Sequence, residues 1–379
     1  RPWTLSAAKP AMFMWNPSST LLSAATLIGL LVCSAAADSA TCADNATTVP
    51  VIRLVSADPA AVDRALREVG FLAIVDHGVD EAVIEAAWRE TAAWFARDAV
   101  EKARAPLLGP EYPYGYSPLH SESHPGSDDD ERARQPGQGA PTLADEKEMF
   151  CIGPQKTNEN GAPARLWPER SDALQAAWVA YFDEMVKLSE RILALFATAL
   201  GLTDSRWFEQ FDRHHASALR AINYPALAHD LAPGQLRSSA HTDYGALTIL
   251  RVGGSGLQIF SRANEWGDVP EIDQSNGSVF VINLGDLMSR WTAGRWLSTP
   301  HRVVVPKGDT ASAPGSSFAD ARQALAYFHN MDMNALIETI PTCRPAEGTP
   351  QKFAPILAGE HLMKKHEAAT RGQTLNIYA

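Results

Sequence analysis

The chain has 379 residues, and 33 Lys and Arg against 44 Asp and Glu leave a formal net charge of −11 at pH 7. A nucleic-acid partner is not expected, because phosphate binding needs a basic surface. Hydrophobic residues make up 45% of the chain and aromatic residues 8%, which is ordinary for a globular protein and excludes extended disorder.

The first 45 residues are predicted to be a leader rather than part of the fold. An apolar run, LLSAATLIGLLV, covers residues 21–32, and Ala35 and Ala37 follow it in a small-x-small pattern. The run suits a signal-peptide core and is too short for a spanning helix, which needs about 20 apolar residues. The protein is secretory or organellar if residues 21–37 act as a signal, and cytoplasmic otherwise. In either case we expect no stable membrane span in the mature chain.

Residues 46–155 are predicted to form an N-terminal region that alternates strand and helix. Asp58 is a suitable N-cap with Pro59 in the first turn, and Gly70 suits the end of that helix. The four predicted runs are VPVIRLV, PAAVDRALREVG, FLAIVDHG and DEAVIEAAWRETAAWFARD. A stretch rich in Ser, Pro, Gly and charge at 117–146 indicates a long surface loop.

Residues 156–215 are predicted to be a helical support. Apolar residues recur at steps of three and four from about Ser171 to Leu200, which indicates one long amphipathic helix. From 216 to 345 the pattern changes to short β-type runs separated by Gly, Pro, Asn and Asp, typical of an antiparallel sandwich or small barrel. A helix and tail at 346–379 close the chain. The fold class is therefore α+β, with a mainly β core between N-terminal and C-terminal helices.

One histidine in the β region is two positions from an aspartate, so the two side chains can lie close together. In SSAHTDYGALTIL, His241 and Asp243 are two positions apart, and in an extended segment such residues face the same side. A third ligand could come from His301, which opens the run HRVVVP. Two histidines and one carboxylate on one face bind non-haem Fe(II) and leave positions open for other ligands. The alternative for the His-Asp pair alone is a structural hydrogen bond beside a turn.

The sequence around these residues resembles the isopenicillin N synthase-like branch of the Fe(II)/2-oxoglutarate oxygenases. The motifs that carry the resemblance run from about Val49 to about Gly372 and occur in the family's order. They are VPVIRL, GFLAIVDHGVD, KEMFCIGP, INYP, HTDYGALTIL, GLQIF, VINLGDLMSRWTAGRWLSTPHRVVVP and PILAGEHLMKKHEAATRG. The resemblance implies a double-stranded β-helix, or jelly roll, for the β core.

The resemblance also implies roles for single residues. The family's HxD…H motif falls on His241, Asp243 and His301, which would bind iron. Its tyrosine before a proline falls on Tyr224, which would bond the distal carboxylate of 2-oxoglutarate.

The family's R-x-S motif falls on Arg322, whose guanidinium would pair with the same carboxylate. Here the expected Ser is Ala324, so one hydroxyl donor is missing. Arg302 is an alternative for the arginine, although on a strand it would face away from its neighbour His301.

The implied activity is oxidation of a small organic substrate with O₂ as oxidant, using Fe(II) as cofactor and 2-oxoglutarate as co-substrate, with release of succinate and CO₂. Two alternatives stay open: an iron-dependent oxidase that works without 2-oxoglutarate, and a catalytically silent binding protein of the same fold. The expected partners are a small-molecule substrate and no nucleic acid, in a monomer or weak oligomer.

Overall fold

The structure of this protein is a computed structural model of the chain. The residues described are 48–106, 114–121, 143–154, 165–227, 230–272, 274–275, 277–306 and 321–370. Within these ranges no helix combines the length and the hydrophobicity that crossing a bilayer requires. Most of the predicted surface loop at 117–146 and the proposed leader lie outside the described residues.

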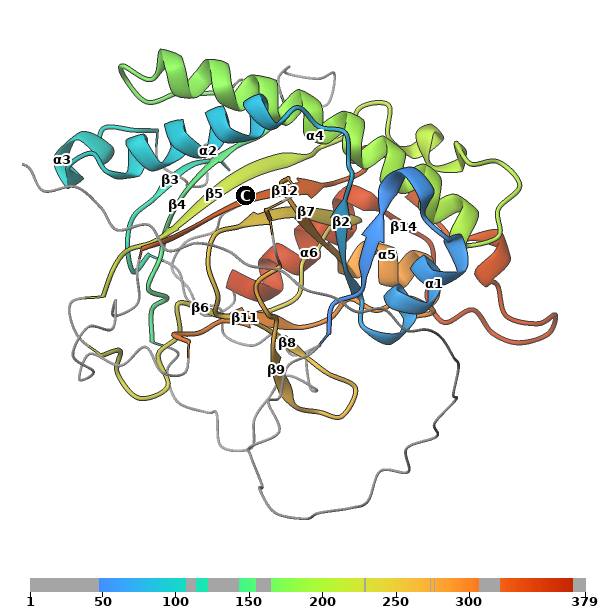
Figure 1. Cartoon of the computed structure of the whole chain (residues 1–379). Coiled ribbons are helices and arrows are strands. Elements are labelled where there is room, and N and C mark those ends of the chain that lie inside the picture. Colours follow the sequence, from blue (N-terminus) through green and yellow to red (C-terminus); the bar gives the residue numbers. More distant parts are fainter. Residues whose placement is uncertain are drawn as a thin grey trace, which may run out of the picture. The chain divides into compact units, whose positions relative to one another are not determined.

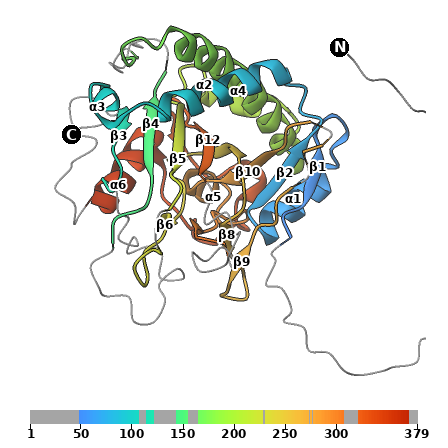
Figure 2. The same ribbon diagram turned by 60° about the vertical axis from the view of Figure 1, so that its left-hand side comes forward.

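A large sheet of eight strands forms the centre of the molecule, in the order β1-β2-β10-β7-β12-β5-β4-β3 (Figure 2). Only its first pair, β1 with β2, is parallel; the other neighbours are antiparallel. The strands are β1 Val51–Arg53, β2 Phe71–Val75, β3 Gly115–Ser117, β4 Glu148–Ile152, β5 Ala218–Tyr224, β7 Leu247–Val252, β10 Phe280–Leu284 and β12 Arg322–His329.

A smaller sheet of four strands, in the order β6-β11-β8-β9, completes the β core. Its strands are β6 Ser238–His241, β8 Leu257–Phe260, β9 Trp266–Asp268 and β11 His301–Val303. A separate pair joins β13 Leu336–Ile337 to β14 Ile356–Leu357. Two stacked antiparallel layers of this kind are what the predicted jelly roll requires.

Helices cover the outer face of the large sheet. Figure 1 shows α2 and α4 lying across it, on the side away from β6, β8, β9 and β11. The α-helices are α1 Pro59–Glu68, α2 Glu81–Phe95, α3 Ala99–Lys102, α4 Asp172–Ala199, α5 Asp286–Trp291 and α6 Ala358–Thr370. Short 3₁₀ turns occur at Leu54–Ser56, Trp207–Phe211 and Pro341–Cys343.

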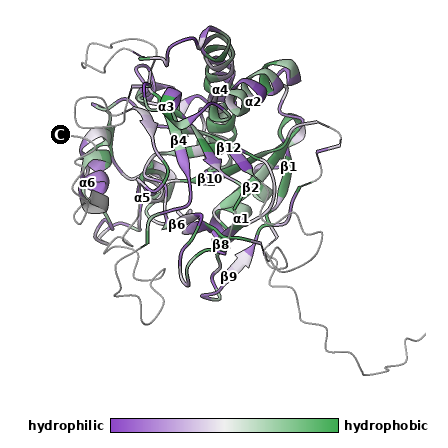
Figure 3. Cartoon of the chain, turned by 90° about the vertical axis from the view of Figure 1, so that its left-hand side faces the viewer, coloured by the Kyte–Doolittle hydropathy of each residue, from purple (hydrophilic) through white to green (hydrophobic). Residues whose placement is uncertain are grey.

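Alternation along the strands divides the core into two layers. On β2, Leu72 and Ile74 belong to the hydrophobic cluster under the helices, whereas Phe71 and Ala73 belong to the cluster between the two sheets. This follows from the two-residue period of a strand, which sends successive side chains to opposite faces. Because both of its faces are covered, β2 is hydrophobic along its length, as Figure 3 shows.

Local signals in the sequence predicted the longer helices closely. The side chain of Asp58 accepts a hydrogen bond from the Ala60 amide, as expected of an N-cap. Gly70 has a φ of 74°, and a Cβ there would lie 2.7 Å from the Leu297 carbonyl oxygen, so glycine is needed at this turn. The helix expected from about Ser171 to Leu200 runs from Asp172 to Ala199.

The β runs predicted after residue 216 are strands β5, β7, β8, β10, β11 and β12. Six strands of the described chain were not predicted: β3, β4, β6, β9, β13 and β14. The pairing of β4 with β5 brings strands of the N-terminal region into the same sheet as the rest of the core. Strands of the N-terminal region therefore belong to the β core itself, which the sequence had placed at 216–345.

Candidate functional site

Strand pairing places the two predicted histidines opposite each other. In the small sheet, His241 at the end of β6 is the direct partner of His301 at the start of β11. The centroids of their imidazole rings are 4.4 Å apart. Residues 60 positions apart in the chain are thus cross-strand neighbours, because β6 and β11 pair antiparallel.

Asp243 completes the cluster from outside the strand. Its Oδ1 atom lies 3.9 Å from Nε2 of His241 and 3.9 Å from Nε2 of His301. One ligand atom from each of the three residues falls within 4.8 Å of the others, so the group could hold a metal ion. The sequence argument expected Asp243 to face His241 along one strand. Strand β6 instead ends at His241, and Asp243 reaches the cluster from the following turn.

Backbone carbonyls set the orientation of both imidazoles. Nδ1 of His241 lies 2.8 Å from the Ser239 carbonyl oxygen, and Nδ1 of His301 lies 3.1 Å from that of Thr299. A carbonyl oxygen only accepts, so Nδ1 carries the proton in each ring and a neutral ring keeps its Nε2 lone pair. Both Nε2 atoms face Oδ1 of Asp243. Fixing the tautomer through the distal nitrogen is how proteins orient histidine ligands.

Two buried side chains hold the other carboxylate oxygen of Asp243. The Asn283 amide donates to Oδ2 at 2.6 Å, and the Thr248 hydroxyl donates to the same atom. Oδ2 is thereby fixed while Oδ1 stays directed at the imidazoles. Sequence reasoning missed both donors. A signal was present, because each is a polar residue inside an apolar run, ALTIL and VINL.

The turn after Asp243 packs tightly against the start of α5. The Asp286 amide donates to the Asp243 carbonyl at 2.7 Å, and the Thr242 hydroxyl donates to the Asp286 carboxylate at 3.1 Å. A Cβ on Gly285 would lie 2.2 Å from the Gly245 carbonyl oxygen. Any larger residue at position 285 would push the two segments apart and move Asp243.

Helix α6, near the C-terminal end of the described chain, also contacts the segment that follows Asp243 and the start of α5. Nε2 of His361 lies 3.2 Å from the Tyr244 carbonyl oxygen, and the Lys365 ammonium lies 3.0 Å from the Asp286 carboxylate. Burial lowers the pKa of His361 to about 4, against the opposing effect of Asp286. The imidazole is therefore neutral at pH 7, and Nε2 donates its proton to the carbonyl.

Tyr224 and Arg322 also meet through strand pairing. They are direct partners across β5 and β12, and the Arg322 guanidinium carbon lies 4.9 Å from the centroid of the Tyr224 ring. Arg322 is only 6% exposed, and among the described residues its Nη1 atom has no hydrogen-bond partner. A buried guanidinium nitrogen without a partner is costly, so this site is suited to an anion.

The space between the sheets connects the two groups. Tyr224 packs in the same hydrophobic cluster as Phe71, whose ring contacts that of His301 at 5.5 Å between centroids. The His-Asp-His cluster and the Tyr224–Arg322 pair therefore both border the space between the two sheets. Ala324, two residues after Arg322 on β12, is 2% exposed and has no polar atom in its side chain to offer an anion.

Arg302 lies elsewhere, as the alternation argument expected. Its guanidinium carbon stacks 4.2 Å from the centroid of the Trp266 ring, and its Nε donates to the Gln258 side chain at 2.7 Å. Both partners belong to the small sheet. The contacts favour Arg322 over Arg302 as the arginine beside Tyr224.

A second arginine, which the sequence did not indicate, lies near Tyr224. Arg237 is 2% exposed, and its guanidinium carbon is 6.0 Å from the Tyr224 ring centroid. Burial lowers the pKa of Arg237, and the charge of Arg322 acts in the same direction. The available signal was its position four residues before His241.

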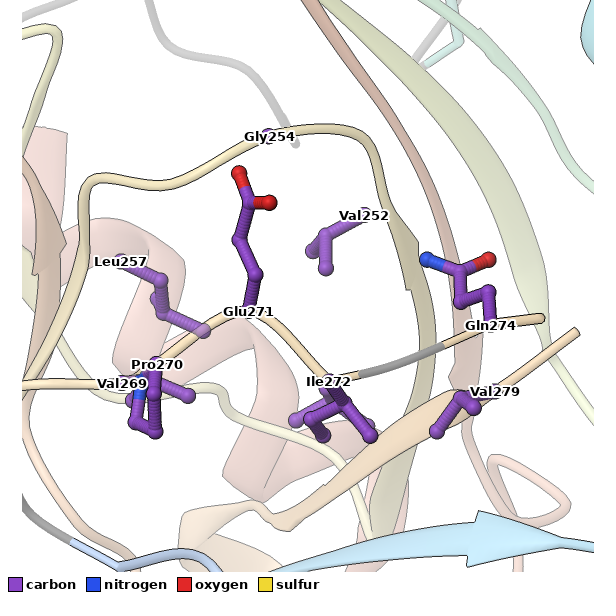
Figure 4. A pocket seen from close by; sticks show the side chains of 10 residues that line it. Val252, Gly254, Leu257, Val269, Pro270, Glu271, Ile272, Gln274 and Val279 are labelled. Atoms are coloured by element: carbon purple, nitrogen blue, oxygen red, sulfur yellow. The ribbon is translucent and has the colours of Figure 1, made fainter.

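A small pocket adjoins Arg322. Its volume is about 70 Å³, and it is lined by Val252, Gly254, Leu257, Val269, Pro270, Glu271, Ile272, Gln274, Val279 and Val281 (Figure 4). The Gly254 carbonyl accepts from Nε of Arg322 at 3.5 Å, and Figure 4 shows the Glu271 carboxylate directed toward the Gly254 loop. Pockets for small-molecule ligands measure about 300–1,000 Å³, so this one is too small to be a substrate site by itself.

Comparison with known proteins matches both halves of the chain to one enzyme family. Residues 49–170 match the non-haem dioxygenase N-terminal region, described for morphine synthesis, and residues 216–330 match the 2OG-Fe(II) oxygenase superfamily. The chain is 32% identical to validamycin A dioxygenase of Streptomyces hygroscopicus subsp. limoneus, over 60% of this chain and 60% of that protein. It is 32% identical to the 2-oxoglutarate-dependent dioxygenase citB of Monascus ruber, over 64% of this chain and 72% of that protein.

Solved structures agree with the sequence relatives. A full-length protein of Neurospora crassa, solved in complex with alpha-KG, superposes with a TM-score of 0.69 at 26% identity and covers 84% of this chain and 95% of its own. A 2OG-Fe(II) oxygenase family protein of Caulobacter crescentus superposes with a TM-score of 0.66 at 24% identity, over 84% of this chain and 97% of its own, and supports the fold. With a jelly-roll core, a His-Asp-His cluster and these relatives, the chain belongs to the Fe(II)- and 2-oxoglutarate-dependent oxygenase superfamily.

Proposed function

We propose that this protein is a non-haem oxygenase that uses Fe(II), 2-oxoglutarate and O₂ to oxidise a small organic substrate, releasing succinate and CO₂. The observation that carries the proposal is the convergence of His241, Asp243 and His301, whose ligand atoms lie within 4.8 Å of one another. Their donor set, two imidazole nitrogens and one carboxylate oxygen, suits Fe(II) and leaves other coordination positions open.

The three ligands are proposed to hold the metal through His241 Nε2, His301 Nε2 and Asp243 Oδ1. Bound Fe(II), with 2-oxoglutarate and O₂, supplies an oxidant able to attack an unactivated C–H bond. The chain contributes fixed geometry: the Ser239 and Thr299 carbonyls orient the imidazoles, and Thr248 and Asn283 immobilise the carboxylate. Ligands that are already in place when the metal binds need no further ordering.

Tyr224 and Arg322 are proposed to hold the distal carboxylate of 2-oxoglutarate. The guanidinium fork can donate two parallel hydrogen bonds to a carboxylate, and Nη1 of Arg322 needs such a partner. Because both side chains are buried, water competes little for these bonds. A requirement for 2-oxoglutarate is therefore favoured over an oxidase that works without it, in spite of Ala324.

The proposed substrate is a small organic molecule, as the names of several relatives suggest for those proteins. One of them is proline hydroxylase buaE of Petromyces alliaceus, 29% identical over 73% of this chain and 82% of its own length. The class of reaction, whether hydroxylation, desaturation or cyclisation, depends on where a substrate C–H bond lies. We also propose that the chain acts as a monomer or weak oligomer, which sedimentation velocity would test.

Anaerobic titration tests this proposal directly. Apo-protein is titrated with Fe(II) and then with 2-oxoglutarate, while the weak visible charge-transfer absorption of the chelate is followed. Wild type is expected to develop the band, and His301→Ala is expected to lack it because one of the three ligands is gone. The matched control is His214→Ala, an exposed histidine outside the cluster, which should behave as wild type.

Two outcomes would contradict the proposal. Absence of Fe(II) binding in wild type would indicate a silent binding protein of this fold. Fe(II) binding without the band would indicate an iron enzyme that does not take 2-oxoglutarate. Where the band appears, release of succinate under O₂ with a panel of small organic acids, amino acids and pyrimidines then screens for the substrate.

A further inference from the structure

The interior next to Tyr224 holds more positive charge than a single arginine supplies. The guanidinium carbons of Arg322 and Arg237 lie 4.9 Å and 6.0 Å from the centroid of the Tyr224 ring. Both arginines are at least nine-tenths buried, with exposed fractions of 6% and 2%. They come from different sheets, because Arg322 begins β12 and Arg237 directly precedes β6.

Backbone groups hold Arg237 in place. Its Nη2 atom donates to the Pro225 carbonyl, immediately after Tyr224, and its backbone amide donates to the Val303 carbonyl at 3.0 Å. The residue is thus tied to the end of β5 and to β11, the strand that begins with His301. A side chain anchored at both ends keeps its charge at one position, as a recognition residue must.

The two guanidinium groups are electrostatically coupled. After burial, the charge of Arg322 is the largest influence that lowers the pKa of Arg237, and Tyr224 and Glu146 oppose it. Arginine stays protonated in proteins, so the chain must accommodate two like charges in a buried place. A bound anion between them would offset this repulsion, and Nη1 of Arg322 lacks a hydrogen-bond partner among the described residues.

A carboxylate has about four lone-pair sites, which one arginine and one hydroxyl leave incompletely paired. The neighbouring inward position on β12 is Ala324, which donates nothing. We propose that Arg237 is a specificity-determining residue for the co-substrate, contacting the distal carboxylate of 2-oxoglutarate together with Arg322 and Tyr224. This inference rests on the proposed function, since it assigns a further residue to the same site.

A second arginine beside Tyr224 would affect which 2-oxo acid the protein binds. A co-substrate without a distal carboxylate could accept no hydrogen bond from Arg322 or, in this proposal, from Arg237, so it would lose two charge-assisted contacts rather than one. The protein should therefore discriminate strongly against 2-oxopentanoate, which has the chain length of 2-oxoglutarate but ends in a methyl group. Removal of Arg237 should weaken this discrimination by reducing affinity for the dicarboxylate alone.

The test compares Arg237→Gln with Arg302→Gln by the anaerobic chelate absorption, using Fe(II) with 2-oxoglutarate or with 2-oxopentanoate. Loss of a charged hydrogen bond predicts that Arg237→Gln weakens 2-oxoglutarate binding about tenfold or more, with 2-oxopentanoate and Fe(II) binding little changed. Arg302 is the matched control, because it is also a partly buried arginine, but it stacks on Trp266 and donates to Gln258, away from Tyr224. Its variant should bind both 2-oxo acids as wild type does.

A second variant separates recognition from a structural role. If Arg237 supplies the donor that Ala324 lacks, Ala324→Ser should restore part of the 2-oxoglutarate affinity of Arg237→Gln and improve wild type less. Arg237→Lys keeps the charge and should lose less affinity than Arg237→Gln, which covers the case in which the Gln variant does not fold.

Equal binding of 2-oxoglutarate by wild type and Arg237→Gln would overturn the inference. An equal loss of both 2-oxo acids would also overturn it, because a purely structural role predicts that result. Failure of wild type to bind 2-oxoglutarate at all would instead reject the proposed function, so the two failures are distinguishable.

Discussion

At the scale of single residues, the two oxygens of Asp243 have different tasks. Oδ2 accepts from Thr248 and Asn283, while Oδ1 lies 3.9 Å from Nε2 of both His241 and His301. A carboxylate with one oxygen fixed cannot rotate freely, so the other oxygen stays directed at the imidazoles. Loss of a neighbour that orients a ligand in this way typically lowers metal affinity about 10–100-fold.

Thr248→Val should therefore weaken Fe(II) binding by about 10–100-fold without greatly changing the fold, because valine has nearly the shape of threonine. Thr91→Val is the matched control, since Thr91 is also buried but lies on α2, where its hydroxyl donates to the Ala87 carbonyl and accepts from the Trp178 indole of α4. Anaerobic Fe(II) titration measures both. Unchanged affinity in Thr248→Val would show that Asn283 alone positions the carboxylate.

At the scale of elements, helices α5 and α6 both contact the segment at Asp243 and Tyr244. The start of α5 binds the backbone of Asp243, and Lys365 on α6 pairs with Asp286 at 3.0 Å. The Lys365 and Asp286 side chains are only 18% and 14% exposed, whereas the neighbouring pair Lys364–Glu360 is 64% and 51% exposed. Weak solvent screening makes the first pair the stronger contact.

Lys365→Gln is expected to lower the free energy of unfolding by about 1–3 kcal/mol, because it leaves a half-buried carboxylate without its cation. Lys364→Gln, one residue earlier on the same helix, should cost about 0.5 kcal/mol or less, because that pair is exposed. Urea denaturation of the two variants measures the difference. Equal losses would mean that α6 does not stabilise the turn through this ion pair.

At the scale of the whole molecule, the half-buried histidine His215 couples the stability of the fold to pH. Burial lowers the pKa of His215 to about 4, with His329 acting in the same direction and Asp212 opposing. Between that value and about 6.5, the ordinary pKa of histidine, the unfolded chain binds a proton that the native chain does not. Stability is therefore lost as the pH falls through this window, because unfolding takes up the proton.

Between pH 7 and pH 5, the unfolding free energy of His215→Leu should fall by about 2 kcal/mol less than that of wild type. Leucine suits the site, because His215 stacks on the Phe182 ring, with centroids 6.3 Å apart. The comparison uses the change in unfolding free energy with pH, so a constant cost of the substitution cancels. The control is His214→Leu, which replaces the exposed neighbouring histidine and should keep the wild-type pH dependence. If the unfolding free energy of His215→Leu changes with pH as it does in wild type, His215 is not the source of the pH dependence.

Local patterns in the sequence were enough to predict much of this protein. The cap at Asp58, the turn at Gly70 and the helix over Asp172–Ala199 follow from interactions within a few residues. The metal motif was also visible, because the resemblance carried the spacing of its residues. Strand alternation does not account for Asp243, since strand β6 ends two residues before it and the segment after the strand brings it to the histidines.

What the sequence by itself determined was therefore most of the runs that form strands and helices, and it predicted the candidate ligands His241, Asp243 and His301 together with Arg322 and Tyr224. Only the tertiary structure decided which polar groups surround them. Thr248 and Asn283 reach Asp243, and Arg237 reaches Tyr224, from separate strands or strand ends. The physical reason is that spacing along the chain fixes local conformation, whereas cross-strand register fixes which distant side chains meet.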